Sequence, residues 1–221
     1  MRLNPPPAAA LFDFDGVIID SREAVRTAIN DALRRHGLRP RPGPELDRYI
    51  GPPASAAFAE LTGESTDSPF VAACVDTYYA CFASVSLELT RVIDGVGAVL
   101  VRLARSLPLA LATAKPLEFA EPLLDTLGLA PCFTLVAAPT VATQDEDKAV
   151  TVARALRKLE VDDAVMVGDR YYDIDAAHAN GLRAIGVTWG IGNAAELGTA
   201  GADVIIDRPE QLLELLGASG R

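Results

Sequence analysis

The chain has 221 residues, of which half are hydrophobic and 23% are charged. This composition indicates a folded chain with a sizeable core rather than extensive disorder, and the length allows one domain or one domain with a smaller insert. The formal net charge of −10 argues against a nucleic-acid-binding or anionic-membrane-binding surface. An anionic substrate would therefore have to be held by a few local cations or by a metal ion.

We expect no export or membrane-spanning segment in this sequence. Prolines at positions 5–7 interrupt the N-terminus, and no apolar run approaches the roughly 18 residues that a membrane span requires. The three cysteines, Cys74, Cys81 and Cys132, are expected to be small buried residues in a reducing compartment. We therefore expect a cytoplasmic protein.

The first part of the chain combines one strand with a long helical stretch. Residues Ala8–Phe12 form an apolar run that ends in acidic residues, which is typical of a buried parallel strand. A helical apolar spacing follows and ends at Gly37, with Asp20 or Ser21 expected to cap its start. Because the helical pattern continues, residues 20–90 are predicted to form a helical insert.

Strands and helices alternate in the rest of the chain. This alternation predicts an α/β fold, a Rossmann-like doubly wound parallel sheet built from residues 1–19 and 91–221 and covered by helices on both sides. Ligands of such sheets bind beyond the carboxyl ends of the strands. The later predicted strands are Leu109–Ala112, Thr134–Ala138, Ala164–Val167, Ala184–Val187 and Asp203–Ile206.

Two carboxylates follow the first strand. In an extended chain Asp13 and Asp15 point to the same side, and two like charges in a cleft raise each other's pKa unless a cation intervenes. Both a metal site and an acid–base role follow from this pattern. A solvated strand end is the alternative.

Groups suited to anion binding follow the second predicted strand and open a later helix. Thr113, Ala114 and Lys115 offer a hydroxyl, free main-chain N–H groups and a cation at a helix start. Lys148 lies at a helix N-terminus, where a cation opposes the helix dipole and so needs another reason to be present. The alternatives are a simple helix cap for Thr113 and a solvated lysine that balances the acidic residues 145–147.

Two further aspartates follow the strand at 164–167. Asp169 leaves that strand at the same sheet edge as Asp13, and Asp173 lies one helical turn further on the same face. Hard oxygen ligands gathered from two strands suit Mg²⁺. Asp175 faces elsewhere and is expected to be exposed to solvent.

Together these clusters resemble the motifs of the haloacid dehalogenase-like hydrolase superfamily, in the right order and over nearly the whole chain. Residues 20–90 then correspond to the helical cap that this family places directly after the first strand. Residues 49–53, 112–116 and 168–174 are most similar to its phosphoglycolate phosphatase-like branch. The matching motifs are Asp13-Phe14-Asp15-Gly16-Val17, Thr113, Lys148, and Gly168-Asp169 with Asp173.

The resemblance implies a Mg²⁺-dependent phosphatase that hydrolyses a small phosphomonoester, such as phosphoglycolate or a nucleotide, through an aspartyl-phosphate. Asp13 would be the nucleophile and Asp15 the general acid and base. The family pattern places Gly16, Thr113, Ala114, Lys115 and Lys148 at the phosphoryl group, and Asp13, Asp15 through its main-chain carbonyl, Asp169 and Asp173 at Mg²⁺.

The chain departs from this branch at two places. Ala114 stands where a serine or asparagine is commonest, so one side-chain hydrogen bond to phosphate is lost. The cap begins with residues 20–23, Asp-Ser-Arg-Glu, in place of the usual Asp-Ser, one residue and Pro. Neither departure touches the nucleophile. The two histidines, His36 and His178, are expected to be structural or surface residues.

Several alternatives remain open at this stage. Within the superfamily they are an inorganic pyrophosphatase or a phosphomutase, and outside it a non-enzymatic phospho-acceptor signalling module. The expected partner is a small phosphorylated metabolite, with no nucleic acid and no membrane, and the protein is expected to be a monomer or homodimer. Arg48 and Lys115 are candidate cations for a second anionic group of the substrate.

Overall fold

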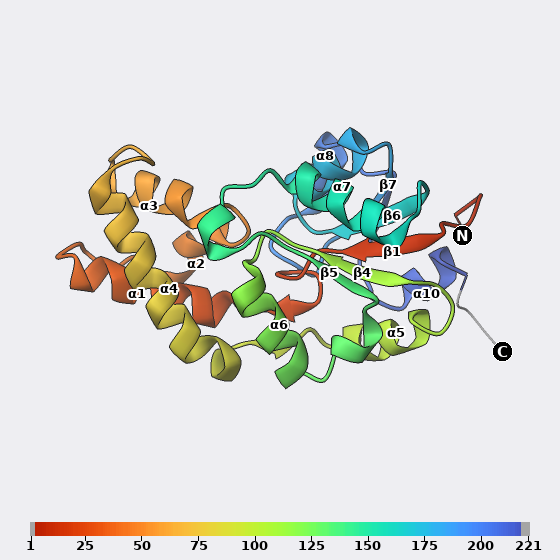
Figure 1. Cartoon of the computed structure of the whole chain (residues 1–221), viewed down its shortest axis with the longest axis horizontal. Coiled ribbons are helices and arrows are strands. Elements are labelled where there is room, and N and C mark those ends of the chain that lie inside the picture. The colour runs from red at the N-terminus through yellow and green to blue at the C-terminus, as the bar shows by residue number, and fades with distance from the viewer. Residues whose placement is uncertain (1–2, 218–221) are drawn as a thin grey trace.

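A computed structural model describes residues 3–217 and contains one large sheet with a helical segment at one end (Figure 1). The order of the six strands is β5-β4-β1-β6-β7-β8, and all neighbouring pairs are parallel. The predicted doubly wound α/β fold is confirmed. The strands are β1 (Ala9–Phe12), β4 (Leu109–Ala112), β5 (Leu135–Ala137), β6 (Ala164–Gly168), β7 (Arg183–Val187) and β8 (Val204–Ile206).

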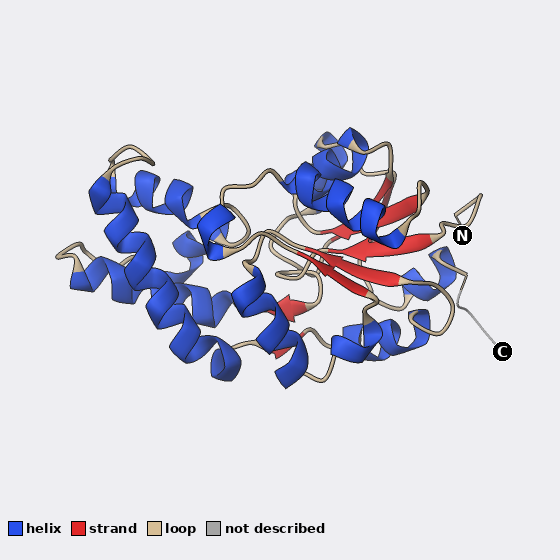
Figure 2. Ribbon diagram, in the orientation of Figure 1, coloured by secondary structure: helices blue, strands red, loops and turns tan. Residues whose placement is uncertain are grey.

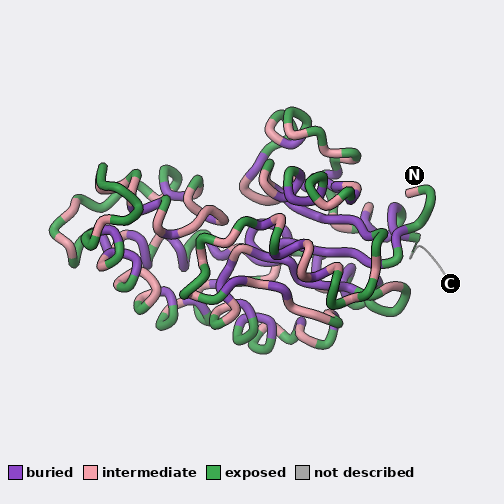
Figure 3. Tube along the Cα trace, turned by 45° about the horizontal axis from the view of Figure 1, so that its top comes forward, coloured by how far each residue is buried: buried purple, intermediate pink, exposed green. Residues whose placement is uncertain are grey.

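Strand β1 lies in the middle of the sheet, between β4 and β6. Its four residues are fully buried because both faces of the sheet are covered: Ala10 and Phe12 pack into one apolar cluster, and Ala9 and Leu11 into another. The trace is buried throughout β1, β4 and β6 (Figure 3). The chain passes from β5 on one side of β1 to β6 on the other, so the carboxyl end of β1 is a topological switch point.

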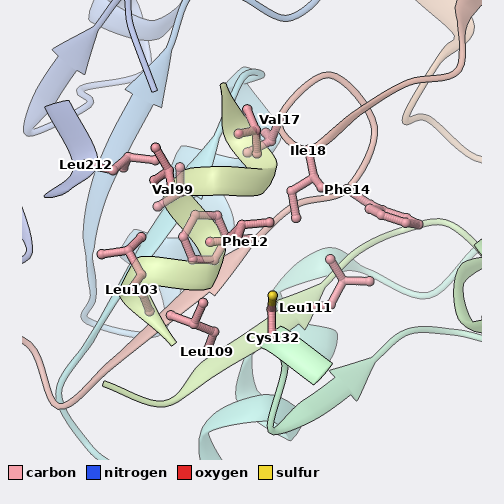
Figure 4. Packing of buried hydrophobic residues seen from close by; sticks show 14 of the residues in the cluster. Phe12, Phe14, Val17, Ile18, Val99, Leu103, Leu109, Leu111, Cys132 and Leu212 are labelled. Carbon is pink, nitrogen blue, oxygen red and sulfur yellow. The ribbon is translucent and has the colours of Figure 1, made fainter. Parts of the chain in front are cut away.

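Helices cover both faces of this sheet (Figure 2). On one face Phe12 packs among Val99, Leu103 and Leu212 (Figure 4). The helices of that face are α5 (Val96–Leu103), α6 (Leu117–Thr126) and α10 (Gln211–Leu215), and those of the other face are α7 (Lys148–Leu159), α8 (Tyr171–Ala179) and α9 (Ala194–Thr199).

The helical segment has an apolar cluster of its own. The chain enters and leaves it through a short antiparallel pair, β2 (Ile19–Asp20) and β3 (Arg91–Val92), in which Ile19 pairs with Val92. Side chains such as Ile29, Phe58 and Phe82 fill its interior. Its helices are α1 (Arg22–Arg35), α2 (Gly43–Leu46), a 3₁₀ turn at Asp47–Tyr49, α3 (Ala54–Thr62) and α4 (Pro69–Leu89).

Helix α4 corrects one expectation from the sequence. It is long and apolar enough, by length and composition alone, to cross a membrane, whereas no segment of that length was expected. In this fold its apolar residues serve another purpose: Val71, Cys74 and Phe82 pack into the core of the helical segment. About a third of its most apolar stretch is buried in this way.

The packing predicts a large difference between two substitutions on α5. Leu103→Ala removes a fully buried side chain and should lower the free energy of unfolding by about 2–5 kcal/mol, because a cavity remains. Val101→Ala, on the exposed side of the same helix, should change it by less than about 0.5 kcal/mol. Urea unfolding followed by circular dichroism measures both, and equal effects would contradict this assignment of the core.

Candidate active site

Four charged side chains from separate elements meet at the carboxyl ends of β1 and β6. Asp13 follows β1, Asp169 follows β6, Asp173 lies in the first turn of α8, and Lys148 is the first residue of α7. Each of these residues is at most 7% exposed. The structure therefore brings together four of the residues that the sequence singled out.

Lys148 is the central cation of this group. Its Nζ lies 2.8 Å from Asp13 Oδ1 and also forms an ion pair with Asp173 Oδ1. Burial lowers the pKa of the ammonium, but the charges of Asp13 and Asp173 outweigh burial, so the pKa of Lys148 is raised. Lys148 consequently stays charged and holds two carboxylates in place.

Asp173 is fixed from the other side by main-chain groups. Its Oδ2 accepts hydrogen bonds from the N–H groups of Asp169 and Arg170, at 3.1 and 3.0 Å. Burial raises the pKa of Asp173 to about 6, with the attraction of Lys148 opposing and the charge of Asp13 adding to the shift. The carboxylate thus has donors on two sides and a defined orientation.

Asp169 has no cation partner among the described residues. Its Oδ2 accepts the N–H of Ile191 at 2.6 Å, but its buried Oδ1 has no hydrogen-bond partner within residues 3–217. Burial, followed by the charges of Asp173 and Asp13, raises the pKa of Asp169 to about 8. This carboxylate is therefore short of positive charge.

The three carboxylates have the arrangement of a metal site. One oxygen from each of Asp13, Asp169 and Asp173 lies within 4.8 Å of the other two. When ionised, three carboxylates beside one ammonium leave two negative charges in a buried place, and Asp169 Oδ1 has neither a hydrogen-bond donor nor an ion pair within residues 3–217. Hard oxygen donors with this excess charge fit a small divalent cation such as Mg²⁺.

Asp15 lies in a different environment from Asp13. Its Oδ2 is 3.2 Å from Lys115 Nζ, and the Ser21 hydroxyl donates a hydrogen bond to its Oδ1. The side chain of Ser21 therefore makes no cap hydrogen bond, although the residue lies at the N-cap position of α1 as predicted. The Asp15 carboxylate is not one of the three clustered carboxylates. The sequence did not predict the hydrogen bond from Ser21 to Asp15, because this contact depends on how β2 returns past residues 13–17.

The remaining predicted phosphoryl-binding residues border the same region. Thr113 is buried, and its Oγ1 accepts the N–H of Lys115 at 3.2 Å. Gly16 has a φ of +79°, and a Cβ there would overlap the Asp169 carboxylate, so only glycine fits. Ala114 lines a pocket that opens beside Asp15.

That pocket lies between the helical segment and the sheet. Aromatic rings from both parts form one wall, with Tyr79 of α4 stacked on Phe119 of α6 at 5.3 Å between ring centroids. Tyr172 of α8 also reaches across, since its hydroxyl donates a 3.4 Å hydrogen bond to the carbonyl of Ile50. Sequence reasoning missed these aromatic residues because helical spacing does not tell a core residue from a pocket residue.

The structure places Arg48 away from this pocket. Its side chain is 62% exposed, forms an ion pair with Glu60 and lies over the ring of Tyr49. The structure does not bring Arg48 to the pocket, and its contact with a second anionic group of the substrate stays a prediction. His36 and His178 contact Thr77 and Asp203 in other parts of the molecule, as expected for structural or surface residues.

Comparison with known proteins agrees with this geometry. Residues 10–187 match the family model described as haloacid dehalogenase-like hydrolase. The chain belongs to the haloacid dehalogenase-like hydrolase family. It is a phosphatase of that family, an enzyme that hydrolyses phosphate monoesters.

The relatives of this chain include proteins named as phosphatases and a protein named as a tyrosine-protein kinase. A phosphoglycolate phosphatase of Pectobacterium atrosepticum is 28% identical and covers 94% of this chain and 92% of its own length. The tyrosine-protein kinase PtkA of Mycobacterium tuberculosis is 29% identical over 96% of this chain and 73% of its own length. A solved structure, a predicted phosphatase from Clostridium acetobutylicum, superposes with a TM-score of 0.88 at 29% identity, covering 95% of this chain and 97% of its own.

The charge balance of this haloacid dehalogenase-like site predicts the effect of removing Lys148. Lys148→Met leaves Asp13 and Asp173 without their cation and should lower the free energy of unfolding by about 3–5 kcal/mol. Lys158→Met, on an exposed position of the same helix, should change it by less than about 0.5 kcal/mol. Urea unfolding in the presence of a chelator makes the comparison, and indistinguishable midpoints would refute the central role of this ammonium.

Proposed function

We propose that this phosphatase is Mg²⁺-dependent and hydrolyses a small phosphate monoester through an aspartyl-phosphate on Asp13. The observation that carries the proposal is the buried Asp13 carboxylate, paired with Lys148 and beside the carboxylates of Asp169 and Asp173. A carboxylate at a central strand end, with a cation and metal-binding groups around it, is suited to nucleophilic attack on phosphorus.

The metal would be held by Asp13, Asp169 and the main-chain carbonyl of Asp15, with Asp173 beside them. The unpartnered Oδ1 of Asp169 supports this assignment. When bound, Mg²⁺ neutralises phosphoryl oxygens and keeps the nucleophile ionised. Two main-chain N–H groups and Lys148 hold the Asp173 carboxylate in a fixed orientation beside these ligands.

The chain's own residues then carry two steps. In the first, an Asp13 oxygen bonds to phosphorus, the bond from phosphorus to the ester oxygen breaks, and Asp15 gives that oxygen its proton. In the second, water attacks the phosphorus of the aspartyl-phosphate, Asp15 takes the proton, and inorganic phosphate is released with Asp13 regenerated. General acid–base help of this kind is worth roughly 10²–10⁴-fold.

Lys115 and Ser21 support the second carboxylate. The ammonium and the hydroxyl contact different oxygens of Asp15 and so fix its rotamer toward the pocket. The phosphoryl group would be held by Lys148, the Thr113 hydroxyl and the main-chain N–H groups near Gly16 and Ala114. Apart from Lys148 these donors are uncharged, which suits a dianion already facing Mg²⁺ and Lys148.

Residues 20–90 would act as a cap over a core formed by residues 1–19 and 91–221. The pocket beside Asp15 has a volume of about 50 Å³, which is room for only a few water molecules. A substrate therefore needs the helical segment to move before it enters. Closure would exclude bulk water during transfer, and opening would admit the water and release the products.

The site of action is proposed to be the cytoplasm. Cys74, Cys81 and Cys132 are all free thiols in the structure. Free thiols are stable in a reducing compartment, where phosphorylated metabolites also occur.

The nucleophile assignment predicts loss of both turnover and covalent phosphate in Asp13→Asn, because an amide oxygen is a poor nucleophile. Asp175→Asn, an exposed change on α8, should keep wild-type activity. Activity of the wild type should vanish with a chelator and return with Mg²⁺. Hydrolysis of phenyl phosphate and intact-mass detection of the phosphoenzyme measure these outcomes, and a normal phosphoenzyme in Asp13→Asn would overturn the assignment.

The cap assignment predicts a difference between two glycines that share a positive φ. A Cβ at Gly51 would overlap the Tyr172 hydroxyl, whereas a Cβ at Gly63 meets nothing within 4 Å. Gly51→Ala should therefore hold the cap away from α8 and lower kcat/KM at least about 10-fold, as misplacement of catalytic groups does. Gly63→Ala strains only the backbone and should lower stability alone. Steady-state kinetics, with thermal unfolding as a control, measure both variants. Equal kcat/KM values for Gly51→Ala and Gly63→Ala would show that the contact between Gly51 and Tyr172 has no part in catalysis.

A further inference from the structure

Most of the side chains that line the pocket beside Asp15 are apolar or aromatic, and a few polar groups lie among them. Aliphatic side chains of the helical segment, including Val25, Ile29 and Ile50, face rings from α4 and α6. The ring of Phe82 lies edge-on to Phe119 at 5.2 Å and stacks with Tyr78 at 5.8 Å. Such a surface favours apolar and aromatic groups.

The charged side chains that line this pocket, among the described residues, are Asp15 and Lys115. They are 3.2 Å apart and paired with each other. The Lys115 ammonium is further engaged by the face of the Phe82 ring, 4.3 Å from the ring centroid. The pocket therefore offers no uncommitted cation to a second anionic group.

The remaining polar groups at the pocket are neutral. The Tyr79 hydroxyl donates to Gln144 Oε1 at 2.6 Å, which leaves the amide NH₂ of Gln144 as a donor. The Tyr78 ring also lines the pocket. Burial raises the pKa of both phenols, so they stay uncharged, and the negative charges of Asp145 and Glu118 add to the shift at Tyr79.

We propose that this pocket binds the uncharged, largely apolar alcohol part of a phosphate monoester and disfavours leaving groups that carry a second anionic group. The proposal rests on the phosphatase function above and specifies its substrate class. A carboxylate or a second phosphate would be buried without a counter-charge and close to acidic residues, which is costly. The same argument disfavours pyrophosphate as a substrate and ADP as a leaving group, and hence a kinase reaction with ATP.

A matched pair of esters tests the charge requirement directly. Phosphoglycolate and phosphoglycolamide have leaving groups of similar size and differ in the charge of one end. We expect kcat/KM for the amide to exceed that for the carboxylate at least about 10-fold, with benzyl phosphate hydrolysed at least as well as the amide. A preference for phosphoglycolate would overturn this inference while leaving the phosphatase function intact, whereas failure to hydrolyse all three esters would contradict both.

Two substitutions at Gln144 make the test specific to the pocket. Gln144→Lys places a cation at the pocket. It should reduce the ratio of kcat/KM for phosphoglycolamide to kcat/KM for phosphoglycolate at least about 5-fold. Gln144→Met, of similar length but uncharged, should leave that ratio within about 2-fold of the wild type. Arg48 lies outside the pocket, so Arg48→Ala should not change this ratio. An unchanged ratio in a folded Gln144→Lys variant would refute the assigned pocket.

Lys115→Met separates this account from one in which Lys115 receives a substrate carboxylate. If Lys115 acts through Asp15, the variant should lower kcat/KM for phosphoglycolamide and phosphoglycolate by the same factor. A loss confined to phosphoglycolate would show that Lys115 binds the carboxylate and would contradict the proposal. Thermal unfolding with and without inorganic phosphate confirms that each variant is folded and still binds the phosphoryl group.

Discussion

The excess of negative charge around Asp13 is the constraint on which the rest of this structure depends. Three carboxylates lie within a few ångströms of one another in a buried place, and one ammonium, that of Lys148, compensates only one of their charges. Such a cluster is costly unless a cation completes it. The buried strands β1 and β6 hold two of the carboxylates rigidly, and the main-chain donors before α8 hold the third. The sheet thus keeps together charges that would otherwise separate.

The sheet and the helical segment contribute different kinds of side chain to the site. In the proposed function, the sheet supplies the charged groups that would face a phosphoryl group, whereas the helical segment supplies mainly apolar side chains that would face the rest of the substrate. Asp15 lies where these surfaces meet and is fixed by Lys115 from the sheet side and by Ser21 at the start of the helical segment. One carboxylate can therefore serve the reaction centre and also border the surface that selects the leaving group.

The sequence predicted the fold and the clustered charges because both are encoded locally. Apolar runs that end in Asp13 and Asp169 specify two strands with a carboxylate after each, and the parallel sheet brings these strand ends to one edge. The contact of Ser21 with Asp15, the ion pair of Arg48 with Glu60 and the aromatic pocket were not predicted, because each depends on which neighbour a side chain meets in the folded chain. Arg48 meets Glu60 rather than the site, and helical spacing cannot show which neighbour a side chain will find. The domain boundaries and the roles of individual site residues stay predictions.

Titration calorimetry of Mg²⁺ into metal-free protein tests the central claim most directly, since it needs no substrate. The account predicts binding of one Mg²⁺ per chain, with affinity at least about 10-fold weaker in Asp169→Asn, which lacks one carboxylate charge of the cluster. Asp175→Asn, two residues beyond Asp173 but exposed, should bind Mg²⁺ like the wild type. Absence of Mg²⁺ binding in the wild type, or equal affinity in Asp169→Asn, would contradict the claim that this buried carboxylate cluster is a metal site.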